Sequence, residues 1–165
     1  SSSRPIRDLE GFAHPRGGVH TYANRGLAGI DGNISTALGV AYGHKATIAV
    51  LGDLSFLHDL TGLVNKEAIN CRFIVINNDG GGIFSTLPQR GVTGFETVFG
   101  TPHGLNPAAI AQVMGVDAKQ ISSLKELEAE IKAPISGVSV VVCDVPDRES
   151  NADNLKKIVE SLTSI

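Results

Sequence analysis

Three short, mainly apolar runs constrain the fold of this chain more than any other feature of its sequence. They are Ala46–Leu51, Arg72–Ile76 and Val138–Val145, and they are rich in β-branched side chains. A run without polar alternation is typical of a strand buried on both faces, as in parallel sheets. Helical patterns separate the runs. The sequence therefore predicts an α/β fold, an open and mostly parallel sheet with helices on both faces.

The segments between these runs carry signals of their own. We expect helices over Asn33–Tyr42, 56–68, 106–115, 123–132 and 153–162, and short strands over Val19–Tyr22 and Val116–Ile121. Asn106-Pro107 is a good N-cap and first-turn pair, and Ser123-x-x-Glu126 is a capping box. Ser1–Asp8 shows no element of its own. Asp79–Leu105 is rich in glycine, and an irregular stretch of this length in a compact domain is usually functional or mobile.

Composition and charge exclude several classes of protein. A chain of 165 residues with 42% hydrophobic and 19% charged residues fits one globular domain. The net charge of −3 gives no reason to expect nucleic acid or an anionic membrane. We find neither a signal peptide nor an apolar run of the ~20 residues that span a bilayer, so the cytoplasm is expected. Cys71 and Cys143 are expected to be buried free thiols.

Polar residues follow two of the apolar runs directly. Gly52-Asp53-Leu54 closes one run and Asn77-Asn78-Asp79-Gly80-Gly81-Gly82 closes another. Taken alone, Asp53 could be a helix N-cap, and the asparagines could be ordinary turn residues. Neighbouring parallel strands lie roughly 5 Å apart, so both sets of side chains can converge on one ion. Mg²⁺ prefers oxygen ligands and often serves a bound phosphate, which suits Asp53, Asn78 and a carbonyl near Gly80.

The spacing of Gly-Asp-x and Asn-Asn resembles the metal–diphosphate motif of thiamine diphosphate enzymes. Further agreement lies in Asn24–Gly32, Gly52–Leu60, Asn77–Phe84 and Phe99–His103. Together these segments resemble the family of menaquinone-pathway 2-succinyl-5-enolpyruvyl-6-hydroxy-3-cyclohexene-1-carboxylate synthases. In that family a leucine at the third motif position, here Leu54, is usual. The resemblance implies that residues 1–165 are a single diphosphate-binding domain, the C-terminal part of a longer, three-domain chain.

The resemblance also implies a set of site residues. The metal ligands would be Asp53, Asn78 and the carbonyl of Gly80. The cofactor contacts would be Ile30, Gly52, Asp53, Leu54, Ser55, Phe56, Asn78, Gly80, Gly82, Ile83 and Phe84. The substrate contacts would be Ser3, Arg7, Arg25, Ile83, Phe84 and Leu87. Within these sets, Ile30 would hold the cofactor in its bent conformation, and Ser55 and Phe56 would lie where a helix N-terminus meets the diphosphate.

The activity implied by the resemblance is decarboxylation of 2-oxoglutarate and transfer of the succinyl unit to isochorismate. Both substrates are carboxylates, which makes Arg25 and Arg7 reasonable clamps. The cofactors would be thiamine diphosphate and Mg²⁺ or Mn²⁺. In this family the glutamate that activates the cofactor comes from an N-terminal domain, normally of a second subunit of a homodimer. We therefore expect this chain alone to be inactive.

Two alternatives stay open at this point. The chain could be the diphosphate-binding subunit of another thiamine diphosphate decarboxylase or acetolactate-type synthase. It could also be a non-catalytic α/β domain that binds a phosphate ligand or serves oligomerisation, although neither GxGxxG nor GxxxxGK[ST] occurs. The histidines show no metal spacing. His58 and His103 could approach the site, but a surface or structural role is the expectation for both.

Overall fold

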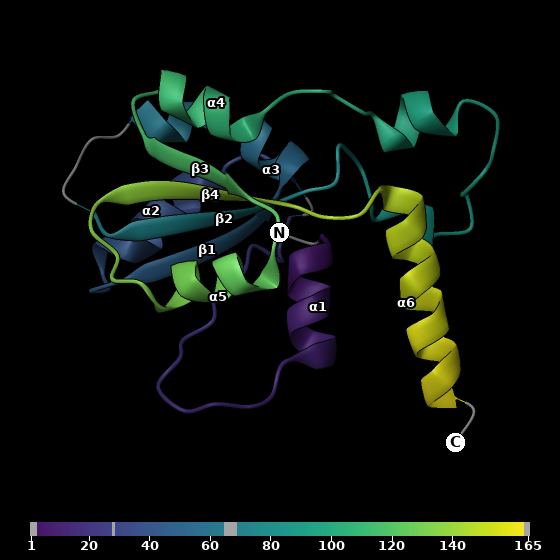
Figure 1. Cartoon of the computed structure of the whole chain (residues 1–165), viewed down its shortest axis with the longest axis horizontal. Coiled ribbons are helices and arrows are strands. Elements are labelled where there is room, and N and C mark those ends of the chain that lie inside the picture. The colour runs from purple at the N-terminus through teal and green to yellow at the C-terminus, as the bar shows by residue number, and fades with distance from the viewer. Residues whose placement is uncertain (1–2, 28, 65–68, 164–165) are drawn as a thin grey trace.

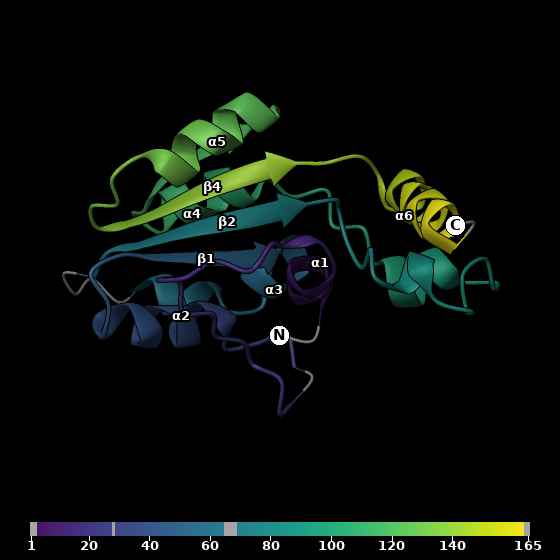
Figure 2. The same cartoon turned by 90° about the horizontal axis from the view of Figure 1, so that it is seen from below.

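The computed structural model describes residues 3–27, 29–64 and 69–163. Its centre is a sheet of four parallel strands in the order β1-β2-β4-β3. The strands are β1 (Thr47–Gly52), β2 (Cys71–Asn77), β3 (Asp117–Ile121) and β4 (Val138–Asp144). Figure 1 shows the four strands side by side, and in Figure 2 α2 lies beyond β1 and α5 beyond β4. The predicted parallel α/β sheet is confirmed.

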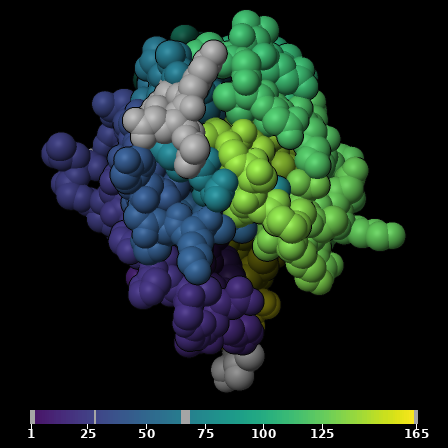
Figure 3. Space-filling model, turned by 90° about the vertical axis from the view of Figure 1, so that its left-hand side faces the viewer, coloured from purple at the N-terminus to yellow at the C-terminus, as the bar shows by residue number. Residues whose placement is uncertain are grey.

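Among the described residues, six α-helices and three shorter helical turns surround or follow the sheet. The helices are α1 (Arg4–Phe12), α2 (Asn33–Tyr42), α3 (Asp53–Leu57), α4 (Pro107–Val113), α5 (Leu124–Lys132) and α6 (Arg148–Thr163). The turns are two 3₁₀ segments, Leu60–Val64 and Phe84–Thr86, and a π-helical turn, Glu96–Gly100. α6 and the turns near it lie beyond the carboxyl ends of the strands (Figure 1). Seen from the opposite end, α6 is almost wholly hidden (Figure 3).

The core lies on both faces of the sheet. On one face α2, α3 and α4 cover the larger cluster, in which Phe56, Phe73 and Val140 are fully buried. On the other face Val141 packs in a smaller cluster to which α5 contributes Leu127. Alternate residues of a strand point to opposite faces, so the buried runs serve both clusters. The prediction of helices on both faces is confirmed.

The second face is less covered at the β1 edge. There Ile48 and Val50 are 40% and 47% exposed, although both belong to a predicted buried run. Val19–Tyr22, expected to be a strand, forms no strand and is exposed. A short strand is stable only when it pairs with a neighbour, and the described structure gives this segment none. The prediction of a strand there is wrong.

Two other element predictions also need correction. The helix expected over 56–68 begins earlier, at Asp53, and ends at Leu57, where the 3₁₀ segment follows after a short turn. Residues 65–68 of that prediction lie outside the described residues. Gly62 lets the 3₁₀ segment pack closely against α2, because a Cβ there would lie only 2.9 Å from Ile34 Cγ2. α6 begins at Arg148 and not at Asp153, since the Asp147 carboxylate accepts hydrogen bonds from Ser150 N (2.9 Å) and Oγ (2.7 Å).

The N-terminal region holds a helix where none was expected. α1 has Pro5 in its first turn, a position where the missing N–H costs nothing. Arg4 and Asp8, one helical turn apart, form an ion pair with 2.5 Å between Nη2 and Oδ1. Both signals are present in the sequence. By contrast, the predicted helix at Asn106-Pro107 and the Ser123–Glu126 capping box are confirmed.

Burial controls the chemistry of both cysteines. Cys71 and Cys143 are buried and unbridged, as predicted, and burial raises the pKa of Cys71 to about 12 and also raises that of Cys143. At pH 8 a pKa near 12 leaves roughly a thousandfold less thiolate than in a free cysteine. We expect neither thiol of the native chain to react with a thiol-specific disulfide reagent within minutes, and both to react after unfolding in guanidinium. Rapid native labelling of Cys71 would contradict this burial.

No helix among the described residues is long and apolar enough to cross a membrane.

Candidate functional site

The site begins with Asp53, which lies directly after β1 at the carboxyl end of the sheet. Parallel pairing places Gly52 of β1 opposite Ile76 of β2, so the residues that follow both strands meet at one edge. The Asp53 side chain is 3% exposed, and its carboxylate accepts hydrogen bonds from Leu54 N (2.7 Å) and Gly80 N (2.8 Å). The structure thus brings Asp53 and Gly80 together, as the sequence predicts.

The glycine turn, Gly80–Gly82, is packed too closely for side chains. A Cβ on Gly80 would lie 2.1 Å from Gly100 O, and one on Gly81 would lie 2.2 Å from Phe99 O. The turn is held there by a hydrogen bond from Gly81 N to Gly100 O (2.7 Å). Gly80 also has a φ of 131°, which favours glycine. The carbonyl of Gly80 accepts one bond, from Gly82 N (3.0 Å), and a carbonyl oxygen has a second lone pair for another partner.

Asn78 lies against the same turn. Its Nδ2 would be 2.1 Å from a Cβ on Gly82, so the absence of a side chain at Gly82 makes room for the amide. Carboxylate, amide and carbonyl oxygens are the donor set that hard divalent cations prefer. No group of three or more His, Cys, Asp or Glu among the described residues could hold a metal ion. A cation at this edge would therefore need amide and carbonyl donors beside Asp53.

His103, which the sequence analysis did not include among the site residues, joins this group. Its Nε2 lies 3.3 Å from Asp53 Oδ2, and its side chain is 10% exposed. Leu105 N donates to Nδ1 (3.0 Å), so Nδ1 carries no proton and Nε2 is the nitrogen that donates to Asp53. The sequence analysis allowed that His103 could approach the site, and it does; a surface position is wrong, because the imidazole is nearly buried against the Asp53 carboxylate. The available signal was the segment Phe99–His103 itself.

Asp79 ties the two ends of the long loop together. Its Oδ1 accepts hydrogen bonds from Gly104 N (2.8 Å) and His103 N (2.9 Å). These bonds, that of Gly104 first, hold the pKa of the Asp79 carboxyl below its usual range. Asp79 adopts a φ of 56°, in the left-handed region that few non-glycine residues visit. Loop 79–104 therefore starts and ends at one point beside Asp53.

A second polar group fastens the loop before α2 to the start of α3. The Asn33 amide donates to Ile30 O (2.8 Å) and to Ser55 Oγ (2.9 Å), and the Ser55 hydroxyl donates to Ile30 O (3.0 Å). Asn24 donates in turn to Asn33 Oδ1 (3.3 Å). Two predicted cofactor contacts, Ile30 and Ser55, are thus joined through Asn33, a residue that sequence reasoning did not select.

The predicted apolar residues divide into two groups. Phe84 belongs to an aromatic cluster in loop 79–104, with 5.4 Å between its ring centroid and that of Phe99, and 5.6 Å between those of Phe99 and Phe95. Ile83 is partly buried beside it, and Leu87 is exposed. Phe56, in contrast, is fully buried in the core, so only its backbone can contact a ligand.

The predicted substrate contacts in the N-terminal region are not gathered at Asp53. A cavity of about 840 Å³ is lined by parts of α1, β1, α2 and the segment 18–24. Ser3, Gly52 and Ser55 are also among the residues that line it. Arg7 and Arg25 are exposed and do not line it. Asp8, next to Arg7 in the sequence, forms its ion pair with Arg4.

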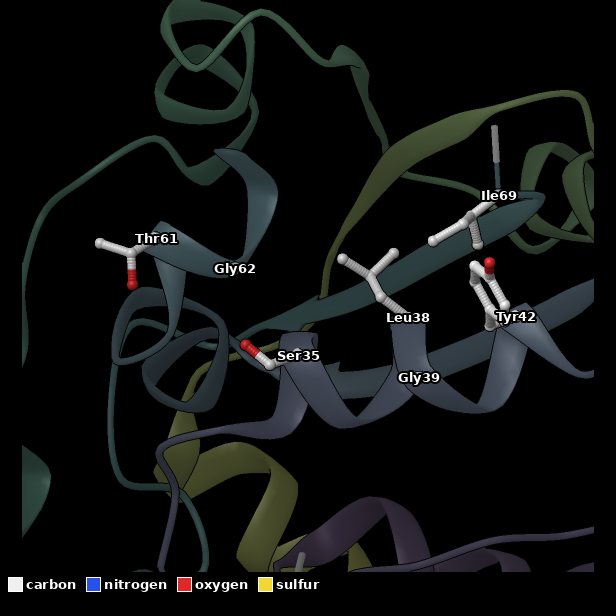
Figure 4. Close-up of a pocket in the computed structure, with 7 residues that line it drawn as sticks. All are labelled: Ser35, Leu38, Gly39, Tyr42, Thr61, Gly62 and Ile69. Carbon is white, nitrogen blue, oxygen red and sulfur yellow. The ribbon is translucent and has the colours of Figure 1, made fainter. Parts of the chain in front are cut away.

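Another cavity, of about 560 Å³, lies between α2 and the 3₁₀ segment after α3. Figure 4 shows Ser35, Leu38 and Tyr42 along α2 on one side and Thr61 on the other. None of the predicted site residues lines it, so it is separate from the site at Asp53.

Comparison with protein families gives one match over most of the chain. A family model described as "Thiamine pyrophosphate enzyme, C-terminal TPP binding domain" matches residues 9–145. Thiamine pyrophosphate is another name for thiamine diphosphate. Asp53, the glycine turn and His103 all fall within the matched range.

Two curated relatives with the same name cover most or all of this chain. A 2-succinyl-5-enolpyruvyl-6-hydroxy-3-cyclohexene-1-carboxylate synthase of Thermobifida fusca is 44% identical over 76% of this chain and 24% of its own length. The synthase of that name from Staphylococcus aureus strain JH9 is 38% identical over 100% of this chain and 30% of its own length. These relatives confirm the predicted resemblance. The chain spans less than a third of the length of either.

Solved structures show the same fold at lower identity. A thiamine diphosphate-dependent 4-hydroxybenzoylformate decarboxylase of Rhodococcus jostii RHA1 aligns with a TM-score of 0.60 at 18% identity, over 71% of this chain and 23% of that one. A benzoylformate decarboxylase of Polynucleobacter necessarius aligns with a TM-score of 0.56 at 23% identity, over 69% and 22% of the two chains.

Proposed function

Since the chain belongs to the family of C-terminal thiamine pyrophosphate-binding domains, we propose that its site at Asp53 binds a divalent cation and, through it, the diphosphate of thiamine diphosphate. One observation carries the proposal. The buried Asp53 carboxylate accepts a hydrogen bond from Gly80 N of the glycine turn, with 2.8 Å between Gly80 N and Asp53 Oδ2. Gly80 has no side chain that would block an ion beside this carboxylate.

The residues present fit such a cation. Asp53 supplies a negative charge, Asn78 an amide oxygen and Gly80 a carbonyl oxygen. Mg²⁺ takes few protein ligands and completes its octahedron with phosphate and water, and Mn²⁺ accepts similar donors. Because Asp53 is buried, its charge costs free energy unless hydrogen bonds or a cation compensate it. The N–H groups of Leu54 and Gly80 and the His103 imidazole provide part of that compensation, and the ion would provide more.

The remaining contacts surround this centre. Ile30 and Ser55, joined through Asn33, would support the cofactor on one side, with Gly52, Leu54 and the backbone of Phe56 nearest the diphosphate. Gly82, Ile83 and Phe84 would border it on the other. The partly buried Ile83 and Phe84, with Leu87, would keep water from the reacting centre.

We further propose that the whole protein has the activity named for its relatives, with 2-oxoglutarate and isochorismate as substrates. When bound, thiamine diphosphate supplies an electron sink for decarboxylation of a 2-keto acid. The chain's part would be to bind and orient. Arg25, Arg7 and Ser3 would meet the substrate carboxylates once the rest of the protein closes over them. The activating glutamate would come from an N-terminal domain, in a homodimer.

The test is calorimetric titration of the chain with thiamine diphosphate, with Mg²⁺ and then with EDTA. We expect saturable binding that requires the metal. ADP and inorganic pyrophosphate are the matched probes, because they share the diphosphate but lack the thiamine. Equal affinity for ADP would contradict the proposal and favour a general phosphate-binding domain. In a steady-state assay the chain alone is expected to release no CO₂ from 2-oxoglutarate.

A further inference from the structure

Arg148, the first residue of α6, reaches the glycine turn from a separate part of the chain. Its guanidinium donates from Nη1 to Asp79 O and from Nη2 to the Glu96 carboxylate, and its side chain is 12% exposed. A second arginine, Arg90 of the long loop, joins the loop to α6 by exposed ion pairs with Glu149 and Asp153. Figure 1 shows α6 beyond the carboxyl ends of the strands, beside the loop that contains the glycine turn.

The arginine side chain lies against glycines. A Cβ on Gly80 would lie 2.9 Å from Nη1, and one on Gly100 would lie 3.2 Å from Nη2. A Cβ on Gly82 would lie 3.7 Å from Cγ of the same side chain. The missing side chains at these positions therefore make room for Arg148 as well as for the turn itself.

One peptide group links Arg148 to Asp53. The carbonyl of the Asp79–Gly80 peptide accepts from Arg148, and the N–H of the same peptide donates to Asp53 Oδ2 at 2.8 Å. A peptide beside a glycine rotates easily, because glycine allows both signs of φ. With both of its ends bonded, this peptide is held with its N–H toward Asp53, and the next peptide, which carries the Gly80 carbonyl, is held by the bond from Gly81 N to Gly100 O.

The arrangement is costly for folding. The Nε of Arg148 is buried and has no hydrogen-bond partner among the described residues, which costs free energy. Asp79 and Thr101, the two described non-glycine residues with positive φ, both belong to loop 79–104, and Glu96–Gly100 is a π-helical turn. Strained backbone and π-helical turns concentrate at functional sites. A surface arginine such as Arg90 would fasten α6 without these costs.

We propose that Arg148 is a positioning residue of the metal site. It holds the Asp79–Gly80 peptide with its N–H toward Asp53, and so keeps Asp53 and the Gly80 carbonyl in the geometry that binds the ion. Glu96 holds the guanidinium in place and offsets its charge beside the cation. This inference rests on the proposed function, since it assigns Arg148 to the same metal site.

The test compares Arg148→Lys with Arg90→Lys. Each substitution removes the planar guanidinium, which can donate to two partners, and keeps the positive charge. In the ligand-free chain, hydrogen exchange of the Gly80 amide is expected to be faster in Arg148→Lys and unchanged in Arg90→Lys. With thiamine diphosphate present, the Kd for Mg²⁺ is expected to rise about tenfold or more in Arg148→Lys only, as for other supporting partners of metal ligands. Thermal unfolding of both variants shows whether lost stability alone accounts for the change.

Each outcome bears on one claim. Equal Gly80 exchange in wild type and Arg148→Lys overturns the inference, and so does an equal rise of the Mg²⁺ Kd in both variants. If the wild-type chain binds no metal, the proposed function is contradicted for this chain, and Gly80 exchange alone then decides the role of Arg148. Should Arg148→Lys fail to fold, Glu96→Gln replaces it, with smaller changes expected in the same direction.

Discussion

Asp53→Asn is expected to abolish metal-dependent binding of thiamine diphosphate while leaving the chain folded. Loss of the only carboxylate proposed as a ligand removes the charge that attracts the cation. The carboxylate accepts from both Leu54 N and Gly80 N, whereas an amide has one accepting oxygen, so one of these N–H groups would face an NH₂ donor. Calorimetry with Mg²⁺ present is expected to show affinity at least about a hundredfold weaker.

Asp59→Asn is the matched control for that experiment. Asp59 is also a buried aspartate, and its carboxylate accepts from Ser35 N (2.7 Å) and Ser35 Oγ (3.2 Å) at the start of α2. Its loss is expected to cost about 1 kcal/mol of stability, as for other helix caps, with metal-dependent binding retained. Binding by Asp53→Asn at wild-type affinity would rule out Asp53 as a metal ligand.

Gly81→Ala is expected to destabilise the chain by about 3 kcal/mol, the upper end of the range for overpacking. The new Cβ would lie 2.2 Å from Phe99 O and 2.9 Å from the Phe84 ring. Because the nearer atom is backbone, relief requires that loop 79–104 move away from the glycine turn and break the bond from Gly81 N to Gly100 O. Urea denaturation monitored by circular dichroism measures the change.

Gly39→Ala is the control for added volume. Gly39 lies inside α2, and a Cβ there would meet nothing within 4 Å. Alanine in a helix interior is expected to stabilise the chain by about 0.5–1 kcal/mol. Equal unfolding midpoints for Gly81→Ala and wild type would show that the glycine turn is not held against loop 79–104 as described.

The sheet and the meeting of Asp53 with Gly80 follow from local sequence. Strands buried on both faces leave continuous apolar runs, and parallel strands end at one edge, so residues just after two neighbouring strands must be close. The strand expected at Val19–Tyr22 failed because a strand depends on its pairing partner as well as on its own residues. α1 was missed although Pro5 and the Arg4–Asp8 pair indicate a helix.

His103 and Arg148 could not be placed from sequence patterns. They are 50 and 69 residues from the groups they contact, Asp53 and Asp79. The path between depends on left-handed residues such as Asp79 and on close backbone contacts at the glycine turn. Such contacts are set by tertiary structure, and no short periodicity encodes them. The segment Phe99–His103 was recognised only through its resemblance to other chains.

The separation between Asp79 and Arg148 has a consequence for the order of folding. Non-local contacts form late, because the entropy of closing a long loop is lost before the contact can stabilise the chain. β1 and β2 can pair once residue 77 has left the ribosome, whereas β4, which completes the sheet, and Arg148, which gives the Asp79–Gly80 peptide its second bond, emerge together near the end of the chain. During synthesis the β1–β2 pair would therefore precede the finished site, and a nascent chain stopped before α6 would lack the arginine that orients the peptide beside Asp53.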